Sequence, residues 1–243
     1  RQMCIRDRDL KAGDINEVRR LIEKYEMPVL GYTPEHNAYP YNYMIGSEAQ
    51  RRDAVDYLKL SLEMAKEMGA EFVLTSPANG GYLATYDQLW SRLEKNIQEL
   101  GDYAAKLEIK LVVEALTPYE SNFFTRANDL VELFRRVDNP YVVGMCDIVP
   151  PFVQHESIMA YFDKLGNKMD HMHIIDGENG SDTHMIPGEG NIPIKEMLYE
   201  MKRIGYDKTA TLELVTNYIN EPRFYAKRAI DNMRELMAEA GIV

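Results

Sequence analysis

"YVVGMCDI", residues 141–148, is a continuous apolar run that closes on an acidic residue, Asp147. A strand that is buried on both faces has such an uninterrupted run, whereas a strand with one wet face alternates apolar and polar residues. Both faces of a parallel sheet are buried when helices and a packed interior cover them. This stretch therefore predicts one strand of a parallel, helix-covered sheet.

The same pattern recurs on both sides of this run. Similar apolar runs alternate with amphipathic segments of helical period, which is typical of repeated βα units. We predict six strands, at residues 27–33, 71–76, 110–116, 141–148, 170–176 and 209–215. We also predict seven helices, at residues 14–25, 47–68, 86–107, 127–137, 156–165, 194–204 and 223–240.

The predicted fold class is α/β, as a (β/α)8 TIM barrel. Eight strands close a barrel of this type, and only six are visible here. Because a helix comes first, we expect a strand, a helix and a strand to be missing at the N-terminal end, so that the chain is truncated. Residues 1–8 show neither a helical nor a strand period and are predicted to be a non-native or disordered leader. Residues 9–243 are predicted to form a single, incomplete catalytic domain.

Composition narrows the class of protein. The 243 residues carry 28 basic and 39 acidic side chains, a net charge of −11. This charge argues against nucleic acid as a partner, because proteins bind phosphate backbones mainly through Lys and Arg. The sequence has no apolar run as long as a membrane span. Two cysteines are too few for a disulfide framework, which favours a cytoplasmic location.

Ligand-type side chains occupy equivalent places on four of the predicted strands. In a barrel of this type, functional side chains lie where the strands end and the βα loops converge. A charged group beside Val, Leu and Met is costly to bury unless it is paired or bound to metal. A structural ion pair would explain any one position, but four such positions favour a site. They are Glu114, Asp147, His173 and Glu213.

Three carboxylates and one imidazole suit a divalent cation, with Mn²⁺ first and Zn²⁺, Co²⁺ or Ni²⁺ as alternatives. Without a cation, carboxylates held close together raise one another's pKa. We therefore predict one divalent metal ion per chain. His171 lies two residues before His173 on the same strand, and we expect it to support the ligand from below. We expect His36 to face water.

Three loops at the same end of the predicted barrel add candidate substrate contacts. "EALTPYESN" carries Glu120, which either binds sugar hydroxyls or is a solvated acid, and Tyr119. The Gly-rich stretch of residues 176–193 carries His184 and is either a substrate lid or a mobile surface loop. "GYTPEHNAYPYNY" carries four tyrosines, including Tyr32, which suit a sugar or an oligomer contact alike.

With these residues in view, the chain resembles the xylose-isomerase-like barrel superfamily, which includes ketose 3-epimerases, inosose dehydratases and endonuclease IV. The resemblance spans residues 9–236. It rests on "VVEALTPYESN", "VGMCDI", "HMHIID", "IPGEGNIP" and "TLELV", which stand in the order of that family's metal motifs. Within the superfamily, "GYTPEHNAYPYN", "SDTHMIPGEG" and "ELVTNYINEPR" are similar to epimerases of fructosamine (Amadori-type) amino acids.

The resemblance implies roles for these residues. Glu114, Asp147, His173 and Glu213 would bind the metal, and Glu114 and Glu213 would also be the catalytic acid–base pair. One removes the C3 proton and the other returns it on the opposite face, through a cis-enediolate, which interconverts fructoselysine and psicoselysine. Glu120, with His184, Tyr32 and Tyr119, would bind substrate. The small molecule is the expected partner, with a homo-oligomer as a family tendency.

Two departures from the wider ketose 3-epimerase pattern bear on the substrate. Pro150 stands where those enzymes have a histidine, and Asn179 followed by His184 stands where they have an arginine. Both changes favour the larger substrate over a free ketose. The alternatives are an epimerase or isomerase of another ketose or of a cyclitol, and a non-catalytic sugar-binding relic. Five histidines and a charge of −11 argue against a nuclease of the endonuclease IV kind.

Overall fold

The computed structural model describes residues 15–38, 40–178 and 180–242. The chain divides into two compact units, of which the first ends at Gly144 and the second covers Met145–Val243. The boundary falls inside strand β4, Val142–Asp147. The assignment of residues 9–243 to one domain stays a prediction, and residues 1–8 lie outside the described residues.

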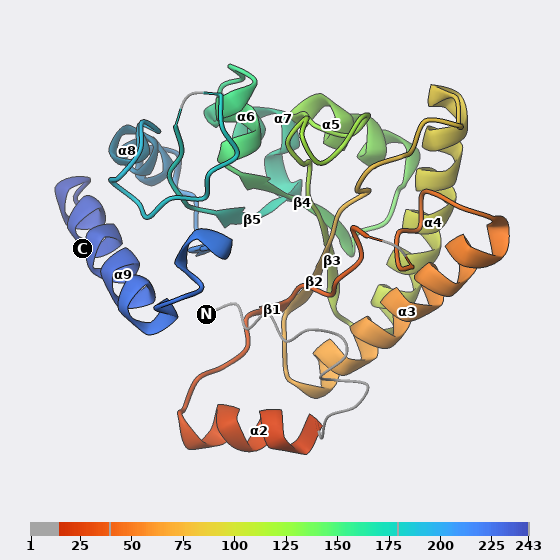
Figure 1. The fold of residues 1–243 in the computed structure, drawn as a ribbon, viewed down its shortest axis with the longest axis horizontal. Coiled ribbons are helices and arrows are strands. Elements are labelled where there is room, and N and C mark those ends of the chain that lie inside the picture. Colours follow the sequence, from red (N-terminus) through yellow and green to blue (C-terminus); the bar gives the residue numbers. More distant parts are fainter. Residues whose placement is uncertain (1–14, 39, 179, 243) are drawn as a thin grey trace. The chain divides into compact units, whose positions relative to one another are not determined.

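The first unit contains a parallel sheet whose strands follow one another in chain order. Tyr32 pairs with Val73, Thr75 with Val113, and Val113 with Gly144 at the start of β4. Its other strands are β1 (Gly31–Tyr32), β2 (Phe72–Thr75) and β3 (Lys110–Val113). Its helices are α2 (Ile15–Lys24), α3 (Glu48–Glu67), α4 (Tyr86–Leu107) and α5 (Ala127–Arg136), and α3 and α4 pack side by side (Figure 1).

Local sequence signals fix the two long helices of this unit. Ser47 and Thr85 each accept a hydrogen bond from a backbone N–H three residues on, and Gln50 and Gln88 return one, so both helices begin with a capping box. Gly101 lets α4 lie close to β4, because a Cβ at this position would stand 2.5 Å from a methyl group of Val142. The two capping boxes explain why the starts of α3 and α4 follow the sequence pattern closely.

The second unit continues the parallel arrangement. Beyond the end of β4, the Ile148 N–H donates to the carbonyl oxygen of His173, and β5 pairs in parallel with β6 through His171 with Thr209 and His173 with Thr211. The strands are β5 (Met169–His173) and β6 (Thr209–Thr211). The helices are α6 (Val149–Val153), α7 (Met159–Leu165), α8 (Ile194–Ile204) and α9 (Pro222–Glu239), with short 3-10 turns η1 (Gly166–Lys168) and η2 (Thr216–Tyr218).

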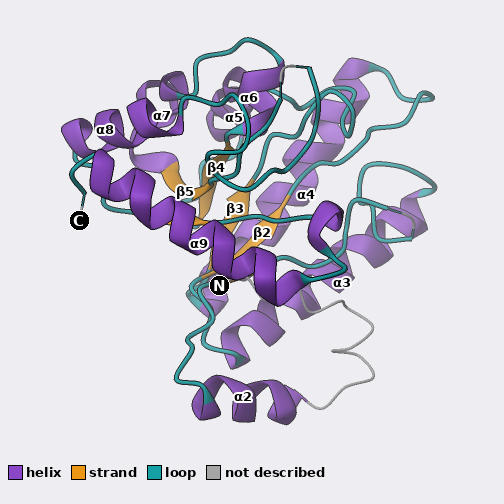
Figure 2. Cartoon of the chain, turned by 60° about the vertical axis from the view of Figure 1, so that its left-hand side comes forward, coloured by secondary structure: helices purple, strands orange, loops and turns teal. Residues whose placement is uncertain are grey.

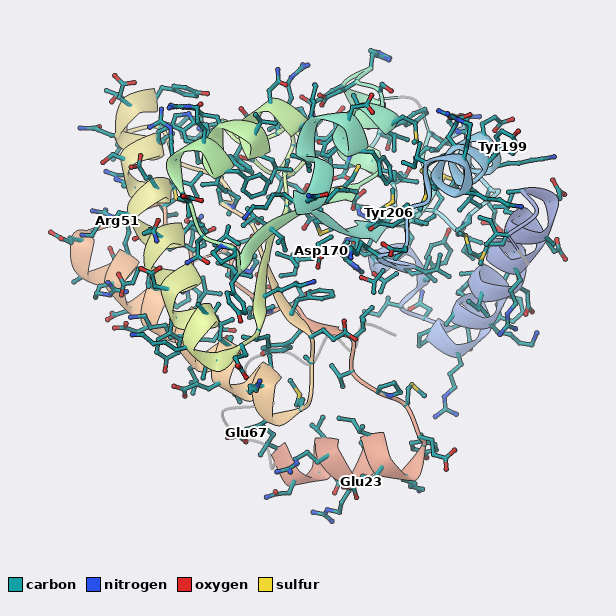
Figure 3. The ribbon with its side chains drawn as sticks, turned by 180° about the vertical axis from the view of Figure 1, so that it is seen from behind. Glu23, Arg51, Glu67, Asp170, Tyr199 and Tyr206 are labelled. Carbon is teal, nitrogen blue, oxygen red and sulfur yellow. The ribbon has the colours of Figure 1, made fainter. Side chains whose placement is uncertain are left out.

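Packing within this unit joins its helices to one another. Helices α8 and α9 contact each other (Figure 2). Tyr206, labelled in Figure 3, follows α8. Its ring meets that of Phe162 on α7 edge-on, with the ring centroids 5.1 Å apart. Among the described residues, no helix is both long and apolar enough to cross a membrane.

The prediction of six parallel strands alternating with helices is confirmed. The observed strands are shorter than predicted, and β6 ends at Thr211, so Glu213 follows its strand instead of lying in it. Helix α6 was not predicted; Pro150 and Pro151 both lie in its first turn, where proline is tolerated. The helix predicted at residues 156–165 begins at Met159.

The prediction that His36 faces water is wrong. His36 is 2% exposed, its Nδ1 donates to the carbonyl oxygen of Pro34 at 2.7 Å, and its Nε2 accepts from the Ser76 N–H at 2.6 Å. A nitrogen that accepts a backbone N–H must carry no proton, so the ring is neutral here. Burial disfavours the imidazolium and lowers the pKa of His36 from 6.5 to about 4.

This burial predicts a specific loss of stability in acid. The unfolded chain protonates His36 near pH 6.5 and the folded chain only near pH 4, so stability should fall as the pH drops through that window. At about 1.4 kcal/mol per pKa unit, the loss attributable to His36 is about 3 kcal/mol. Urea unfolding of the wild type and of His36→Gln at pH 7 and pH 4.5 measures it. The wild type should lose more stability than the variant, and parallel pH profiles would refute the assignment.

Candidate metal centre

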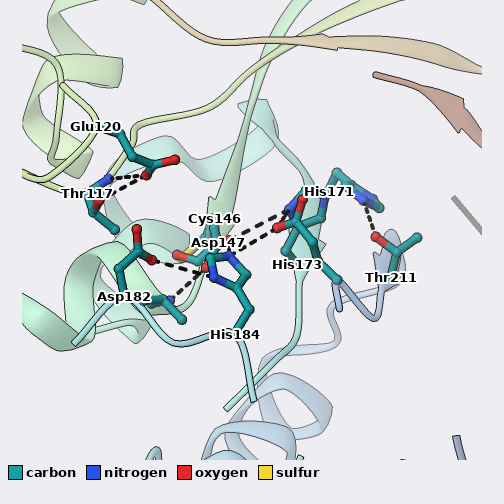
Figure 4. A network of polar contacts seen from close by, with 11 residues as sticks. Thr117, Glu120, Cys146, Asp147, His171, His173, Asp182, His184 and Thr211 are labelled. Carbon is teal, nitrogen blue, oxygen red and sulfur yellow. Dashed lines mark hydrogen bonds and ion pairs between the residues drawn. The ribbon is translucent and has the colours of Figure 1, made fainter. Parts of the chain in front are cut away.

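Three of the predicted ligands lie together in the second unit, at the carboxyl ends of its strands. Asp147 is the last residue of β4, His173 is the last residue of β5, and Glu213 lies two residues beyond β6. His173 Nδ1 is 2.8 Å from Glu213 Oε2 and 3.8 Å from Asp147 Oδ2 (Figure 4). Parallel strands bring these positions to one edge, because their carboxyl ends point the same way.

Burial makes this cluster unusual. Asp147 is 4% exposed and His173 is fully buried, while the side chain of Glu213 retains 26% exposure. Two carboxylates with so little water around them need a positive or proton-donating partner. Their donor set of carboxylate oxygens and an imidazole nitrogen fits a divalent cation.

His184 joins the cluster from the long loop between β5 and α8. Its Nε2 lies 3.3 Å from Asp147 Oδ2 and 3.4 Å from Glu213 Oε2, and its Nδ1 lies 3.5 Å from Asp182 Oδ1 (Figure 4). The imidazole therefore stands between a loop carboxylate and two of the predicted ligands. The predicted loop histidine is turned toward the strand ends, with its side chain 12% exposed.

The charges of the cluster perturb its pKa values strongly. Burial opposes a charge on His184, but its hydrogen bonds to Asp147 and Glu213 and their negative charges outweigh burial and raise the pKa of His184 to about 11. Burial likewise opposes a charge on Glu213, yet the positive charge of His173 and the hydrogen bonds of both histidines hold the pKa of Glu213 well below its usual range. The Glu213 carboxylate is thus stabilised in its ionised form by positive charge close to it, which is what a bound cation also provides.

His171 supports the ligand strand, as predicted. It is 1% exposed, its ring nitrogens lie 2.7 Å and 3.1 Å from the hydroxyl oxygens of Thr209 and Thr211 on β6, and its ring is perpendicular to that of His173. Burial and the charge of His173 lower the pKa of His171 to about 3. A neutral ring bonded to two hydroxyl groups fixes β5 against β6 under the ligand.

The remaining predicted site residues lie in the first unit. Glu114 follows β3, is 8% exposed, and donates its N–H to the carbonyl oxygen of Thr75. The Glu120 carboxylate accepts from the N–H and the hydroxyl group of Thr117 at 3.2 Å and 2.9 Å (Figure 4). Tyr32 is 1% exposed, and Tyr119 is 64% exposed. The roles of these four residues stay predictions.

Two carboxylates near the candidate centre were not singled out from the sequence. Asp182 contacts His184, and Asp176 is a buried acid at the end of the "HMHIID" segment. Nothing in the sequence indicates a role for Asp182, since an acid in a polar loop is usually solvated. The sequence does indicate a structural role for Asp176, because an acid directly before a Gly-rich loop often accepts backbone N–H groups.

Parallel βα units with metal-binding side chain types at their carboxyl ends define a TIM-barrel protein with a candidate divalent-metal centre. The chain belongs to the family of xylose isomerase-like TIM barrels, whose pattern it matches over residues 2–236. The fold class predicted from the sequence is thereby confirmed.

Among its relatives, the chain is similar to fructoselysine 3-epimerase of Shigella flexneri, with 48% identity over 95% of this chain and 84% of the relative. The structure of L-ribulose 3-epimerase matches with a TM-score of 0.78 at 15% identity, over 93% of this chain and 80% of that one. The structure of the IOLI protein with a zinc atom matches with a TM-score of 0.76 at 18% identity, over 98% and 86%. The Shigella flexneri relative is an epimerase, which is an isomerase that acts on carbohydrates. This is the class of enzyme that the sequence predicts.

Removing the predicted ligand His173 should weaken metal binding strongly. We expect His173→Ala to bind Mn²⁺ at least about 100-fold more weakly than the wild type, because it loses a ligand and leaves two carboxylates close together. His155→Asn, which removes an exposed imidazole on the loop before α7, should leave the affinity unchanged. Calorimetric titration of chelator-treated protein measures both. Equal affinity of His173→Ala and the wild type would show that the metal binds elsewhere or not at all.

Proposed function

We propose that this chain is a metal-dependent 3-epimerase that interconverts fructoselysine and psicoselysine. The single observation that carries the proposal is the buried cluster of Asp147, His173 and Glu213, in a chain 48% identical to a fructoselysine 3-epimerase. That cluster offers both a metal site and an ionised base. A binding relic would have no need to keep buried carboxylates ionised.

The proposed metal ligands are Asp147, His173, Glu213 and, as the fourth, Glu114. Glu114 follows Val113, which pairs with Gly144 three residues before Asp147 on the same strand. The carboxylate of Glu114 is the ligand type that completes the donor set. A divalent cation in this site would polarise the carbonyl and hydroxyl groups of a ketose and so acidify the adjacent C–H group. Mn²⁺ is our first choice of metal.

Epimerisation at C3 needs a proton to leave from one face and another to arrive from the opposite face. A single base tends to return the proton to the face it came from, so two acid–base groups are required. We assign them to Glu114 and Glu213. The first carboxylate takes the C3 proton, which leaves a cis-enediolate, and the carboxylic acid form of the second delivers a proton to the other face. The lowered pKa of Glu213 keeps its carboxylate ionised, which is the form that binds a metal ion.

Four further residues are proposed to hold the substrate. Glu120, oriented by Thr117, would accept hydrogen bonds from sugar hydroxyl groups. His184 stands beside Asp147 and Glu213, in the region where ketose 3-epimerases have an arginine, and would contact the oxygens near the reacting carbon. Tyr32 and Tyr119 would border the sugar and its amino acid tail. The second candidate, an epimerase of another ketose, shares this chemistry and differs only in these contacts.

The cytoplasmic location and the homo-oligomer stay predictions.

Proton exchange with solvent tests the proposed chemistry. In D₂O with Mn²⁺, we expect fructoselysine to give psicoselysine that carries deuterium at C3, because the proton removed is not the one returned. NMR locates the label at each carbon, with fructose, tagatose, inosose and abasic DNA as comparison substrates. Label at C1 or C2 would indicate an aldose–ketose isomerase, and no exchange with any sugar in metal-loaded protein would contradict the proposal.

Replacing either proposed base tests its assignment. Glu114→Gln and Glu213→Gln should each lower the rate by roughly two or more orders of magnitude, as expected for a positioned acid–base group. Metal content measured on the same samples separates lost chemistry from lost metal. Glu196→Gln, the same change at an exposed position of α8, should leave the rate unchanged. A full rate in either proposed-base variant would remove that residue from the mechanism.

A further inference from the structure

The loop that carries His184 is built around one buried carboxylate, Asp176. This side chain is 1% exposed. Its Oδ1 accepts from the backbone N–H groups of Gly177 and Ile192, and its Oδ2 accepts from that of Gly188, each at 2.9 Å. Donors from the start, the middle and the end of the loop therefore converge on one residue.

The backbone of Asp176 adds a second connection. Asp176 and Met185 form an isolated antiparallel bridge, with both N–H···O distances at 2.8 Å. Met185 directly follows His184, so this bridge fixes the backbone from which the imidazole extends. Asp176 thus holds the loop through its main chain and its side chain at once.

Gly190 shows how tightly the loop closes on Asp176. A Cβ at Gly190 would stand 2.5 Å from Asp176 Oδ1 and 2.5 Å from the carbonyl oxygen of Gly177. Only a residue without a side chain fits such a gap. The Asn191 N–H also donates to the Gly177 carbonyl oxygen at 2.8 Å, which ties the two ends of the loop together.

Contacts with the last part of the chain hold the outer side of the same loop. The hydroxyl group of Tyr218 accepts from the Ile186 N–H at 3.0 Å, and the Asn232 amide donates to the carbonyl oxygen of Pro187 at 2.9 Å. Segments on both sides of His184 are therefore anchored, and the base of the loop is a fixed part of the second unit.

We infer that Asp176 is a positioning residue that holds His184 against Asp147 and Glu213 and so sets how the substrate is oriented there. The effect on substrate orientation rests on the proposed function. The placement of His184 by Asp176 does not. Only a carboxylate satisfies this loop, since three N–H donors meet two accepting oxygens. An asparagine would turn one of them into a donor facing another donor.

The test compares two changes that disturb the loop in different ways. Asp176→Asn removes an acceptor, whereas Gly190→Ala keeps every polar group and adds only a methyl group in a closed gap. Both should lower kcat/KM for fructoselysine on the order of a hundredfold, as expected when a positioned group is displaced by about 1 Å. Glu178→Gln, an exposed acid of the same loop, is the matched control and should have full activity.

A double-mutant cycle separates positioning from general damage. If Asp176 acts through His184, Asp176→Asn should add less than about threefold to the loss already caused by His184→Ala, because coupled sites are not additive. Mn²⁺ binding should persist in Asp176→Asn and in Gly190→Ala, since no proposed ligand lies on the loop. Additive losses, or loss of Mn²⁺ in both loop variants, would overturn the inference.

NMR of the histidine ring nitrogens reads the position of His184 without any substrate. The His184 signals should shift in Asp176→Asn and Gly190→Ala, while the His171 signals stay in place. Unchanged His184 signals in both variants would overturn the inference. If the wild type acts on no sugar but these shifts occur, the proposed function has failed and the positioning role stands.

Discussion

Carboxylates gathered where parallel strands end repel one another, and the structure of the second unit is arranged around the positive charge that they need. Asp147 and Glu213 lie within hydrogen-bond or ion-pair distance of the same imidazole, that of His184, and Glu213 also pairs with His173. His184 and Glu213 depend on their neighbours for their charge state, because the opposite charges beside them outweigh the effect of burial on their pKa values. Removing any one of them should therefore disturb the others.

The surrounding structure holds the two histidines by different means. His173 stands at the end of a strand, and His171, bonded to Thr209 and Thr211, braces that strand from below. His184 comes from a loop, where precision normally suffers, and the Asp176 carboxylate supplies the missing rigidity. The proposed ligand on the strand and the proposed substrate contact on the loop are thus held by separate networks, so we expect changes in the loop to leave the proposed metal ligands in place.

The sequence predicts the repeated elements and the strand-end ligands because both rest on local pattern. The apolar run at residues 141–148 marks β4 and ends at Asp147, and capping residues such as Thr85 mark where helices begin. The sequence does not predict that His36 is buried, because the Ser76 N–H group that donates to the His36 ring is 40 residues away in the chain. It does not predict the convergence on Asp176 either, because that depends on how the loop folds back over the residue.

The dependence of stability on metal concentration shows whether the cluster of Asp147, His173 and Glu213 binds a metal ion. Chelator-treated protein should unfold at higher denaturant concentration as Mn²⁺ is added. Its unfolding free energy should rise by about 1.4 kcal/mol for each tenfold increase above the dissociation constant. That slope corresponds to one ion bound per chain in the folded state. An unfolding free energy that does not change with Mn²⁺, Zn²⁺, Co²⁺ or Ni²⁺ would show that the histidines alone balance these carboxylates. The cluster would then not be a metal centre.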